Sequence, residues 1–266
     1  MTSDAQNSAT ENPTTDNTEF QLAWEAAKAT LEAAVADPHG ENYDAAWTDA
    51  VLMVHDPDAP GQMIAEFSDI ALRWLRRWKE EGNEPGVRES MIVTALLAHP
   101  NTPAQTAAAL CVENLIPGMC KQAFADCETI TAEHIQEAAS RWGWNATLAA
   151  HPAVDASQLQ ELIREVDNQP EQWVQVADTL ISHPNATGDQ ITWAWKKTLV
   201  NDPYKAELAT RHPKCPPEVR IAQRFKITDD EVRARRWNKE QLRLAAELVD
   251  GWNRGWDELV MIVETM

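Results

Sequence analysis

The chain has 266 residues, of which 44% are hydrophobic and nine are glycine, and its formal net charge is −19. This composition excludes wholesale disorder and disfavours a sheet-rich fold, whereas the abundance of Ala, Leu, Glu, Gln and Arg favours helices. The acidic surface repels phosphate backbones and anionic membranes at long range. The longest apolar run, at residues 91–98, is far shorter than the roughly 20 residues that cross a bilayer.

The beginning of the chain predicts a disordered acidic tail at residues 1–18, followed by a single α-helical repeat domain at residues 19–266. The tail is rich in Ser, Thr, Asn and Asp and contains neither Lys nor Arg. No basic segment followed by an apolar stretch is present there, so we expect a cytoplasmic protein. In the first part of the domain, apolar residues recur at the spacing of an amphipathic helix: Phe20, Trp24, Ala27, Leu31 and Val35.

A short sequence motif containing His-Pro recurs along the chain and marks the end of one helix and the start of the next. Its histidines are His99, His151, His183 and His212. Proline stops the preceding helix, and the histidine side chain is expected to meet the free carbonyls of the helix that it ends. Four residues after each histidine stands a residue suited to begin a helix: Pro103, Asp155, Thr187 and Pro216.

The spacing of these histidines indicates how many helical hairpins they delimit. They are 52, 32 and 29 residues apart. The two shorter spacings each fit one hairpin, and the longest fits two, one of which lacks the motif; His55-Asp56-Pro57 is a weaker version. Short connections make successive helices antiparallel neighbours. The sequence therefore predicts an all-α fold, a right-handed α-solenoid (superhelix) of stacked antiparallel helical hairpins.

The segment LAHPNTP at residues 97–103 resembles the turn of the leucine-rich repeat variant family and, more generally, HEAT-like repeats. The resemblance covers residues 91–224 and implies repeats that pair one α-helix with a second, shorter helix. Some members of the variant family carry a cysteine-bound iron–sulfur cluster in an N-terminal segment. No cysteine precedes Cys111 here, so that feature is not carried over.

Histidine, cysteine and tryptophan are the residues most able to bind a metal or a ligand. Capping of helices accounts for all four motif histidines without a metal. Cys111, Cys120 and Cys127 lack CxxC spacing and are expected to be buried as small apolar residues, with a zinc or cluster site that also uses Cys215 as the alternative. We therefore predict no metal site and no cofactor. Most of the 12 tryptophans are expected in the core, but those two apart on one helix, Trp193 and Trp195, cannot face the same way.

Two basic islands break the acidic background and supply the candidate binding residues. One spans residues 73–79, and the other spans residues 211–243, where ten basic side chains stand against five acidic ones. Arginine beside tryptophan can clamp carboxylates or phosphates and stack on rings. The simpler interpretation is a solvated helix face whose cations pair with neighbouring acids. The predicted binding residues are Arg73, Trp74, Arg76, Arg77, Trp78, Arg233, Arg235, Arg236 and Trp237.

These features favour a binding protein over an enzyme, and no catalytic residues are assigned. The leading hypothesis is a helical-repeat scaffold that binds another protein through its concave surface or through the basic Arg/Trp region. The first alternative is a HEAT-like DNA-binding protein or a glycosylase that excises alkylated bases, with Asp229 or Asp230 as the acid. The net charge argues against nucleic acid. The second alternative is an acidic protein that mimics DNA or inhibits a nucleic-acid-binding partner.

Overall fold

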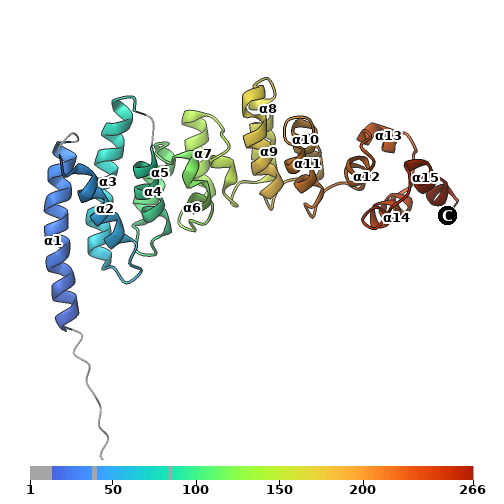
Figure 1. Cartoon of the computed structure of the whole chain (residues 1–266). Coiled ribbons are helices and arrows are strands. Elements are labelled where there is room, and N and C mark those ends of the chain that lie inside the picture. Colours follow the sequence, from blue (N-terminus) through green and yellow to red (C-terminus); the bar gives the residue numbers. More distant parts are fainter. Residues whose placement is uncertain (1–13, 38–40, 84–85, 266) are drawn as a thin grey trace, which may run out of the picture. The chain divides into compact units, whose positions relative to one another are not determined.

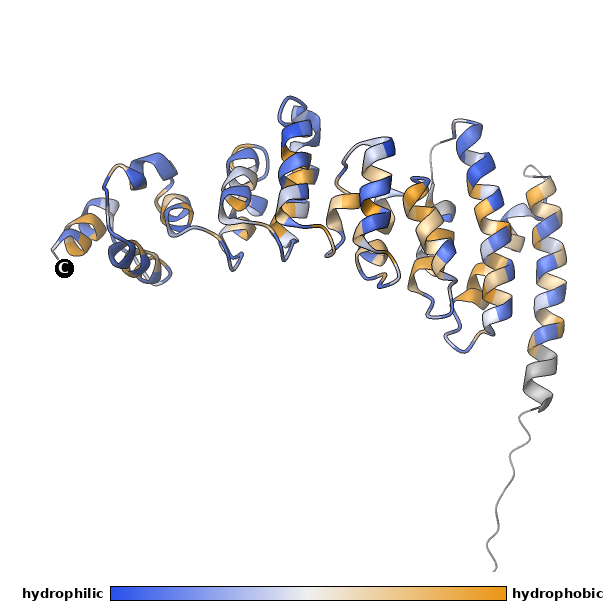
Figure 2. Cartoon of the chain, turned by 180° about the vertical axis from the view of Figure 1, so that it is seen from behind, coloured by the Kyte–Doolittle hydropathy of each residue, from blue (hydrophilic) through white to orange (hydrophobic). Residues whose placement is uncertain are grey.

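A computed structural model describes residues 14–37, 41–83 and 86–265, and all the regular secondary structure in these ranges is helical (Figure 1). The prediction of an all-α fold is therefore confirmed. The described ranges contain fifteen α-helices and three short 3-10 helices. Blue and orange residues alternate along single helices in Figure 2, as expected when each helix buries one stripe against its neighbours.

The chain divides into two compact units, Met1–Ala123 and Phe124–Met266, where the sequence predicts a single domain. In the described part of the chain no helix is long and apolar enough to span a membrane.

The first unit is built from helices that pack side by side around a core rich in aromatic residues. Trp47 lies at the centre of this core, with its ring 4.7 Å from that of Trp74 and 6.2 Å from that of Phe67. All three side chains are at most 2% exposed, and tilted or edge-on ring pairs of this kind add to the stability gained from burial. The helices are α1 (Thr14–Ala36), α2 (Tyr43–Val54), α3 (Gly61–Glu80), α4 (Val87–Ala98), α5 (Ala104–Val112) and η1 (Gly118–Cys120), and α6 (Lys121–Ala125) continues into the second unit.

Helix α1 begins at Thr14, inside the segment that the sequence assigns to a disordered tail. The run Pro13-Thr14-Thr15-Asp16 is itself a helix-start sequence, because proline and acidic residues are favoured in the first turn of a helix. The tail prediction is thus wrong for residues 14–18, and residues 1–13 lie outside the described ranges.

The second unit continues with shorter helices that bury apolar stripes. On α8 the buried residues are Leu159, Leu162, Ile163 and Val166. Helix α9 packs closely on α10, and α12 packs on α14. The helices are α7 (Ala132–Trp142), η2 (Leu148–Ala150), α8 (Ala156–Val166), η3 (Pro170–Gln172), α9 (Trp173–Ser182), α10 (Gly188–Thr198), α11 (Pro203–Thr210), α12 (Pro217–Phe225), α13 (Asp229–Arg233), α14 (Lys239–Val249) and α15 (Trp256–Glu264).

Each His-Pro turn starts its next helix at the predicted position. The N-cap residues of α5, α8, α10 and α12 are Pro103, Asp155, Thr187 and Pro216. Asp155 and Thr187 both form capping boxes, in which the side chain accepts a hydrogen bond from the backbone N–H three residues on. The prediction that the fourth residue after the histidine begins a helix is confirmed.

The motif histidines bond to backbone groups with both ring nitrogens. Nδ1 of His183 accepts a hydrogen bond from the N–H of Asn185 at 3.1 Å, and its Nε2 donates to the carbonyl oxygen of His151, also at 3.1 Å. An N–H can only donate and a carbonyl oxygen can only accept. These two bonds therefore require the neutral ring with its proton on Nε2. A protonated ring would lose the bond at Nδ1.

The same pair of bonds joins consecutive turns of the second unit. His151 donates to the carbonyl of Cys127 at 3.2 Å, and His212 donates to the carbonyl of His183 at 3.3 Å. Their Nδ1 atoms accept from the N–H two residues on, at 3.1 Å in each case. We call His151, His183 and His212 the histidine ladder. In the first unit, His99 bonds in the same way to the carbonyl of Asp56 at 3.0 Å.

The prediction that each histidine caps its own helix is wrong, because the ring does not bond to a carbonyl of that helix. The carbonyl that each ring meets belongs to the turn before it in the chain, so the histidine joins two turns instead of closing one helix. The turn at Cys127 also accounts for the long gap between His99 and His151. The carbonyl of Cys127 accepts a hydrogen bond from His151, just as the carbonyl of His151 accepts one from His183. Thr131, four residues after Cys127, is the N-cap of α7.

The four cysteines are buried, as predicted for small apolar residues. Burial raises the pKa of the Cys215 thiol to about 11, so it is protonated at neutral pH. Among the tryptophans, Trp195 is 2% exposed and Trp193, two residues away, is half-buried. The prediction that the two cannot both face the core is confirmed.

We predict that replacing His183 with Ala lowers the free energy of unfolding by about 2 to 4 kcal/mol, because it leaves two buried backbone groups without partners. His183 is only 2% exposed, so water does not reach those groups readily. Urea denaturation followed by circular dichroism measures the change. His55→Ala removes an exposed histidine and should leave the free energy within about 0.5 kcal/mol of the starting value. Equal effects of the two changes would contradict the paired bonding.

We also predict that acidification from pH 7.5 to 5 destabilises the second unit. Burial lowers the pKa of His151 and of His183 below the ordinary value of 6.5. Below pH 6.5 the unfolded chain therefore binds protons that the folded chain does not, and stability falls as the pH falls towards the folded pKa values. Carboxylates paired with cations act at lower pH: the carboxylate of Glu66, with a pKa of about 2, loses its contribution only below about pH 4.5. Urea midpoints measured at half-unit steps test this, and a variant with His151→Gln and His183→Gln should show a shallower slope.

Candidate anion-binding groove

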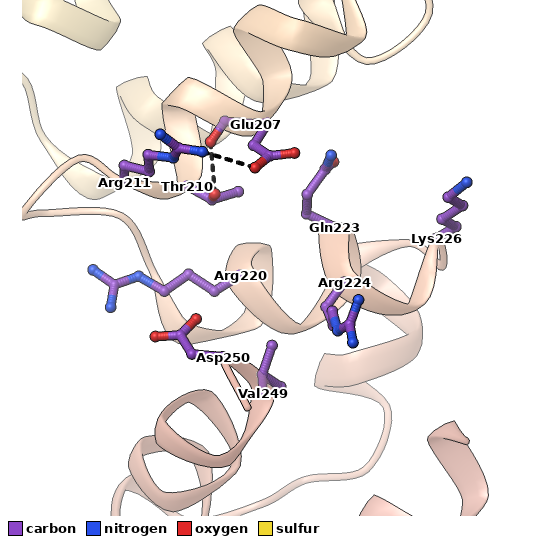
Figure 3. Close-up of a pocket in the computed structure, with 9 residues that line it drawn as sticks. All are labelled: Glu207, Thr210, Arg211, Arg220, Gln223, Arg224, Lys226, Val249 and Asp250. Carbon is purple, nitrogen blue, oxygen red and sulfur yellow. Dashed lines mark hydrogen bonds and ion pairs between the residues drawn. The ribbon is translucent and has the colours of Figure 1, made fainter. Parts of the chain in front are cut away.

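A groove of about 620 Å³ opens in the second unit between α11, α12 and the end of α14 (Figure 3). Helix α11 supplies the acidic and polar side chains of one wall, and α12 supplies most of the cations on the other. The residues that line it are Glu207, Thr210, Arg211, Arg220, Gln223, Arg224, Lys226, Val249 and Asp250.

The lining is positive although the chain as a whole has a net charge of −19. Four cations line the groove against two carboxylates, Glu207 and Asp250. One of the carboxylates is already engaged, because Arg211 pairs with Glu207 at 2.9 Å one turn along α11. Both of these side chains are more than half exposed, so the pair contributes little to stability and can open to admit a ligand.

Arg220, which lines the groove, bonds to the last turn of the histidine ladder. Its Nη2 donates to the carbonyl of His212 at 3.4 Å, the oxygen that would otherwise face the next histidine. Its Nε is buried and has no acceptor among the described residues. The positive charge of Arg220 favours an anionic ligand in the groove.

Gln223 and Arg224 are each fixed by one bond that leaves the remaining polar atoms to the groove. The carboxamide oxygen of Gln223 accepts a hydrogen bond from Nε1 of the buried Trp195 at 2.8 Å, so its NH2 group is left to donate to a ligand. Arg224 donates to the carbonyl of Trp252, which ties α12 to the segment between α14 and α15. Lys226 follows at the left-handed C-cap of α12, with φ of 55°.

The cations do not converge on one point. In Figure 3, Arg211 turns towards Glu207, whereas Arg220, Arg224 and Lys226 project from α12 in different directions. A single phosphate needs donors that meet around it. Separated cations along a groove suit several negative charges spread along an extended chain.

The first predicted island lies on α3, in the first unit, and its arginines are occupied by neighbouring groups. Arg76 forms two bonds to the carboxylate of Glu113, at 2.7 and 2.6 Å. Arg77 pairs with Glu81 at 2.9 Å, and Arg73 donates to the carbonyl of Asp69 at 3.3 Å. Trp74 is 2% exposed and packs against Trp47 and Trp78, whose ring is 5.4 Å from its own.

The binding residues predicted in the second island lie on α13 and in the turn that follows it, outside the residues that line the groove. Arg233 lies 3.3 Å from the carboxylate of Asp229. The guanidinium carbon of Arg235 lies 5.7 Å from the Trp256 ring centroid, and Arg236 is exposed with φ of 55°. Trp237 is 8% exposed and packs on Trp256 at 5.6 Å. The two predicted islands thus belong to different units.

The groove cations do not stand out as a group in the sequence, where arginines next to tryptophan are the stronger signal. Arg211, Arg220, Arg224 and Lys226 all belong to the basic segment 211–243, but no tryptophan adjoins them. A usable signal was present. Arg220 and Arg224 are four residues apart, which places both on one face of a helix.

Asp229, one of the two candidate catalytic acids, is a buried partner of two cations. Its side chain is 1% exposed and lies 2.9 Å from Nζ of Lys196 and 3.3 Å from Nη2 of Arg233. Asp230 is 79% exposed and lies 3.8 Å from Arg233. Asp229 therefore fixes the N-terminus of α13 against α10.

The described residues contain no group of three or more His, Cys, Asp or Glu side chains placed to hold a metal ion. Comparison of the chain with family models, with curated proteins and with solved structures found no match.

We predict that Asp229→Asn lowers the free energy of unfolding by about 1 to 3 kcal/mol, because it removes the buried negative charge that faces Lys196 and Arg233. Asp230→Asn is the matched control: the same chemical change at an exposed neighbour should shift the value by less than about 0.5 kcal/mol. Urea denaturation measures both. Equal stability of the two variants would show that the buried ion pairs do not fix α13.

Proposed function

We propose that this chain is a helical-repeat scaffold, a right-handed solenoid of antiparallel hairpins, that binds an acidic segment of another protein in the groove between α11 and α12. The recurring turns support the repeat architecture, since the same two histidine bonds and the same helix start return along the chain. The observation that carries the binding proposal is the cluster of four cations in the groove of a chain with a net charge of −19.

Exposed apolar side chains on and just before α11 add to the description of the partner. Tyr204 is 71% exposed and lies three and seven residues before Glu207 and Arg211 on α11, so the three share one face of the helix. Leu199 and Val200, just before α11, are 40% and 85% exposed. Exposed apolar side chains next to a charged groove are typical of protein-binding surfaces. The partner segment is expected to carry several Asp or Glu residues with one or two large apolar residues.

A protein partner fits the charge distribution better than a nucleic acid does. Nucleic-acid affinity depends on many phosphate contacts, and the excess of acidic side chains elsewhere on the chain opposes the approach of a long polyanion. A short acidic peptide meets the local positive charge of the groove without extending over that surface. The glycosylase alternative also needs a free catalytic acid, whereas Asp229 is engaged by Lys196 and Arg233.

We predict that Arg211→Glu with Lys226→Glu weakens binding of a fluorescein-labelled peptide of alternating Glu and Phe at least about tenfold, as measured by fluorescence anisotropy. Both side chains are exposed, so the double variant should keep its circular dichroism spectrum. Reversing two cations in contact with a ligand removes two attractive pairs and creates two repulsive ones.

The matched control is Arg235→Glu with Arg236→Glu, which makes the same change in net charge outside the groove. It should weaken binding less than about threefold if only long-range attraction is affected. An equal loss in both double variants would place binding outside the groove. A 12-base DNA duplex that binds more tightly than the peptide and loses affinity only in the groove variant would replace the acidic peptide with nucleic acid.

A further inference from the structure

Lys197 on α10 lies against two tryptophan rings. Its Nζ is 3.4 Å from the ring centroid of Trp173, on α9, and 5.5 Å from that of Trp193, one turn earlier on α10. The carboxylate of Asp167, just after α8, lies 3.3 Å from the same nitrogen. Two ring faces and one carboxylate therefore surround a single ammonium group. We call Trp173, Trp193 and Asp167 the aromatic cage.

The walls of the cage are held in place by bonds that do not involve the lysine. Nε1 of Trp173 donates to the carbonyl of Val166 at 3.0 Å, and Nε1 of Trp193 donates to Oδ1 of Asp167 at 3.4 Å. Helices α9 and α10, which carry the two rings, also pack closely on each other (Figure 1). The rings should therefore keep their positions if Lys197 leaves.

The chemistry of the cage is selective for an ammonium group. The face of an indole ring is negative and attracts cations, and the attraction grows when the cation is poorly hydrated. An alkylated ammonium is less hydrated than a lysine and presents more surface to the rings. The bonds from Trp193 and from Lys197 hold the pKa of Asp167 below its ordinary value, so the carboxylate is charged at neutral pH.

The cage opens to solvent. The side chain of Lys197 is 21% exposed and that of Asp167 is 56% exposed, and both rings are half-buried. The lysine side chain is long and flexible, so it can leave the cage by changing rotamers without any movement of α10. An external cation can then take its place with no change in the number of charges inside the cage.

We propose that the aromatic cage of Trp173, Trp193 and Asp167 is a binding site for an alkylammonium group that the chain's own Lys197 keeps closed. The ligand is a methylated lysine side chain of a partner protein or a free quaternary amine, which share this chemistry. The site is separate from the anion-binding groove and does not depend on the function proposed for it.

The test compares Lys197→Ala, which empties the cage, with the unaltered protein. The probe is choline, and the readout is the indole N–H signals in proton–nitrogen correlation spectra, assigned through Trp173→Phe and Trp193→Phe. In the Lys197→Ala protein, choline should give saturable shifts confined to those two indoles. The unaltered protein should need about tenfold more choline for the same shift, because its own lysine competes.

Three controls define the outcome. Lys205→Ala removes a lysine that pairs with Asp178 at 3.2 Å and should leave choline binding as in the unaltered protein. The neutral isostere 3,3-dimethyl-1-butanol should give no saturable shift. Asp167→Asn in the Lys197→Ala background should weaken choline binding. If Lys197→Ala does not fold, as judged by circular dichroism, Lys197→Gln replaces it.

A folded, emptied cage that gives no saturable shift with choline would overturn the proposal, and so would equal shifts with the neutral alcohol. A peptide with one trimethyllysine that binds at least about tenfold more tightly than choline would support the proposal with a protein as the source of the ligand. Equal affinities would support it with a small quaternary amine as the source.

Discussion

The interaction on which the rest of the second unit depends is the hydrogen bond from each motif histidine to the carbonyl of the preceding turn. Burying a turn between helices leaves backbone N–H and C=O groups out of reach of water, and each needs a partner. A neutral imidazole satisfies one of each at once: the N–H two residues on and the carbonyl of the turn before. Because a hydrogen bond at each ring nitrogen fixes the ring, the histidine sets the spacing between successive turns. It also satisfies the backbone groups that become buried between them.

The two proposed binding sites lie where side chains are not fully engaged in this packing. Most arginines on α3, α13 and α14 pair with acids within a turn of helix or across to the next helix. The groove differs because α12 ends the series of His-Pro turns, and Arg220 takes the carbonyl that has no further histidine to bond. The cage differs because its cation is a lysine on a flexible stem facing two anchored rings.

Much of the helical architecture could be predicted from the sequence, because its signals are local. Proline after histidine, capping residues four positions later and apolar stripes all act within one or two turns of chain. The partner of each histidine could not be predicted, since the carbonyl it meets lies 24 to 43 residues away. The aromatic cage likewise unites Asp167, Trp173 and Trp193 from three helical segments. The groove cations lacked adjacent tryptophans, so only the spacing of Arg220 and Arg224 pointed to a shared face.

The histidine bonds run in one direction, and this makes the two ends of a series unlike. The first turn of a series needs only a carbonyl, which any residue supplies, and in each unit that position holds a residue other than histidine: Asp56 in the first and Cys127 in the second. Every later turn must also carry a histidine ring, which donates to the carbonyl of the turn before it. A hairpin copied with its single His-Pro turn would bring both the donor and the acceptor required at each junction. The histidine bonds on either side of such a copy would therefore stay satisfied.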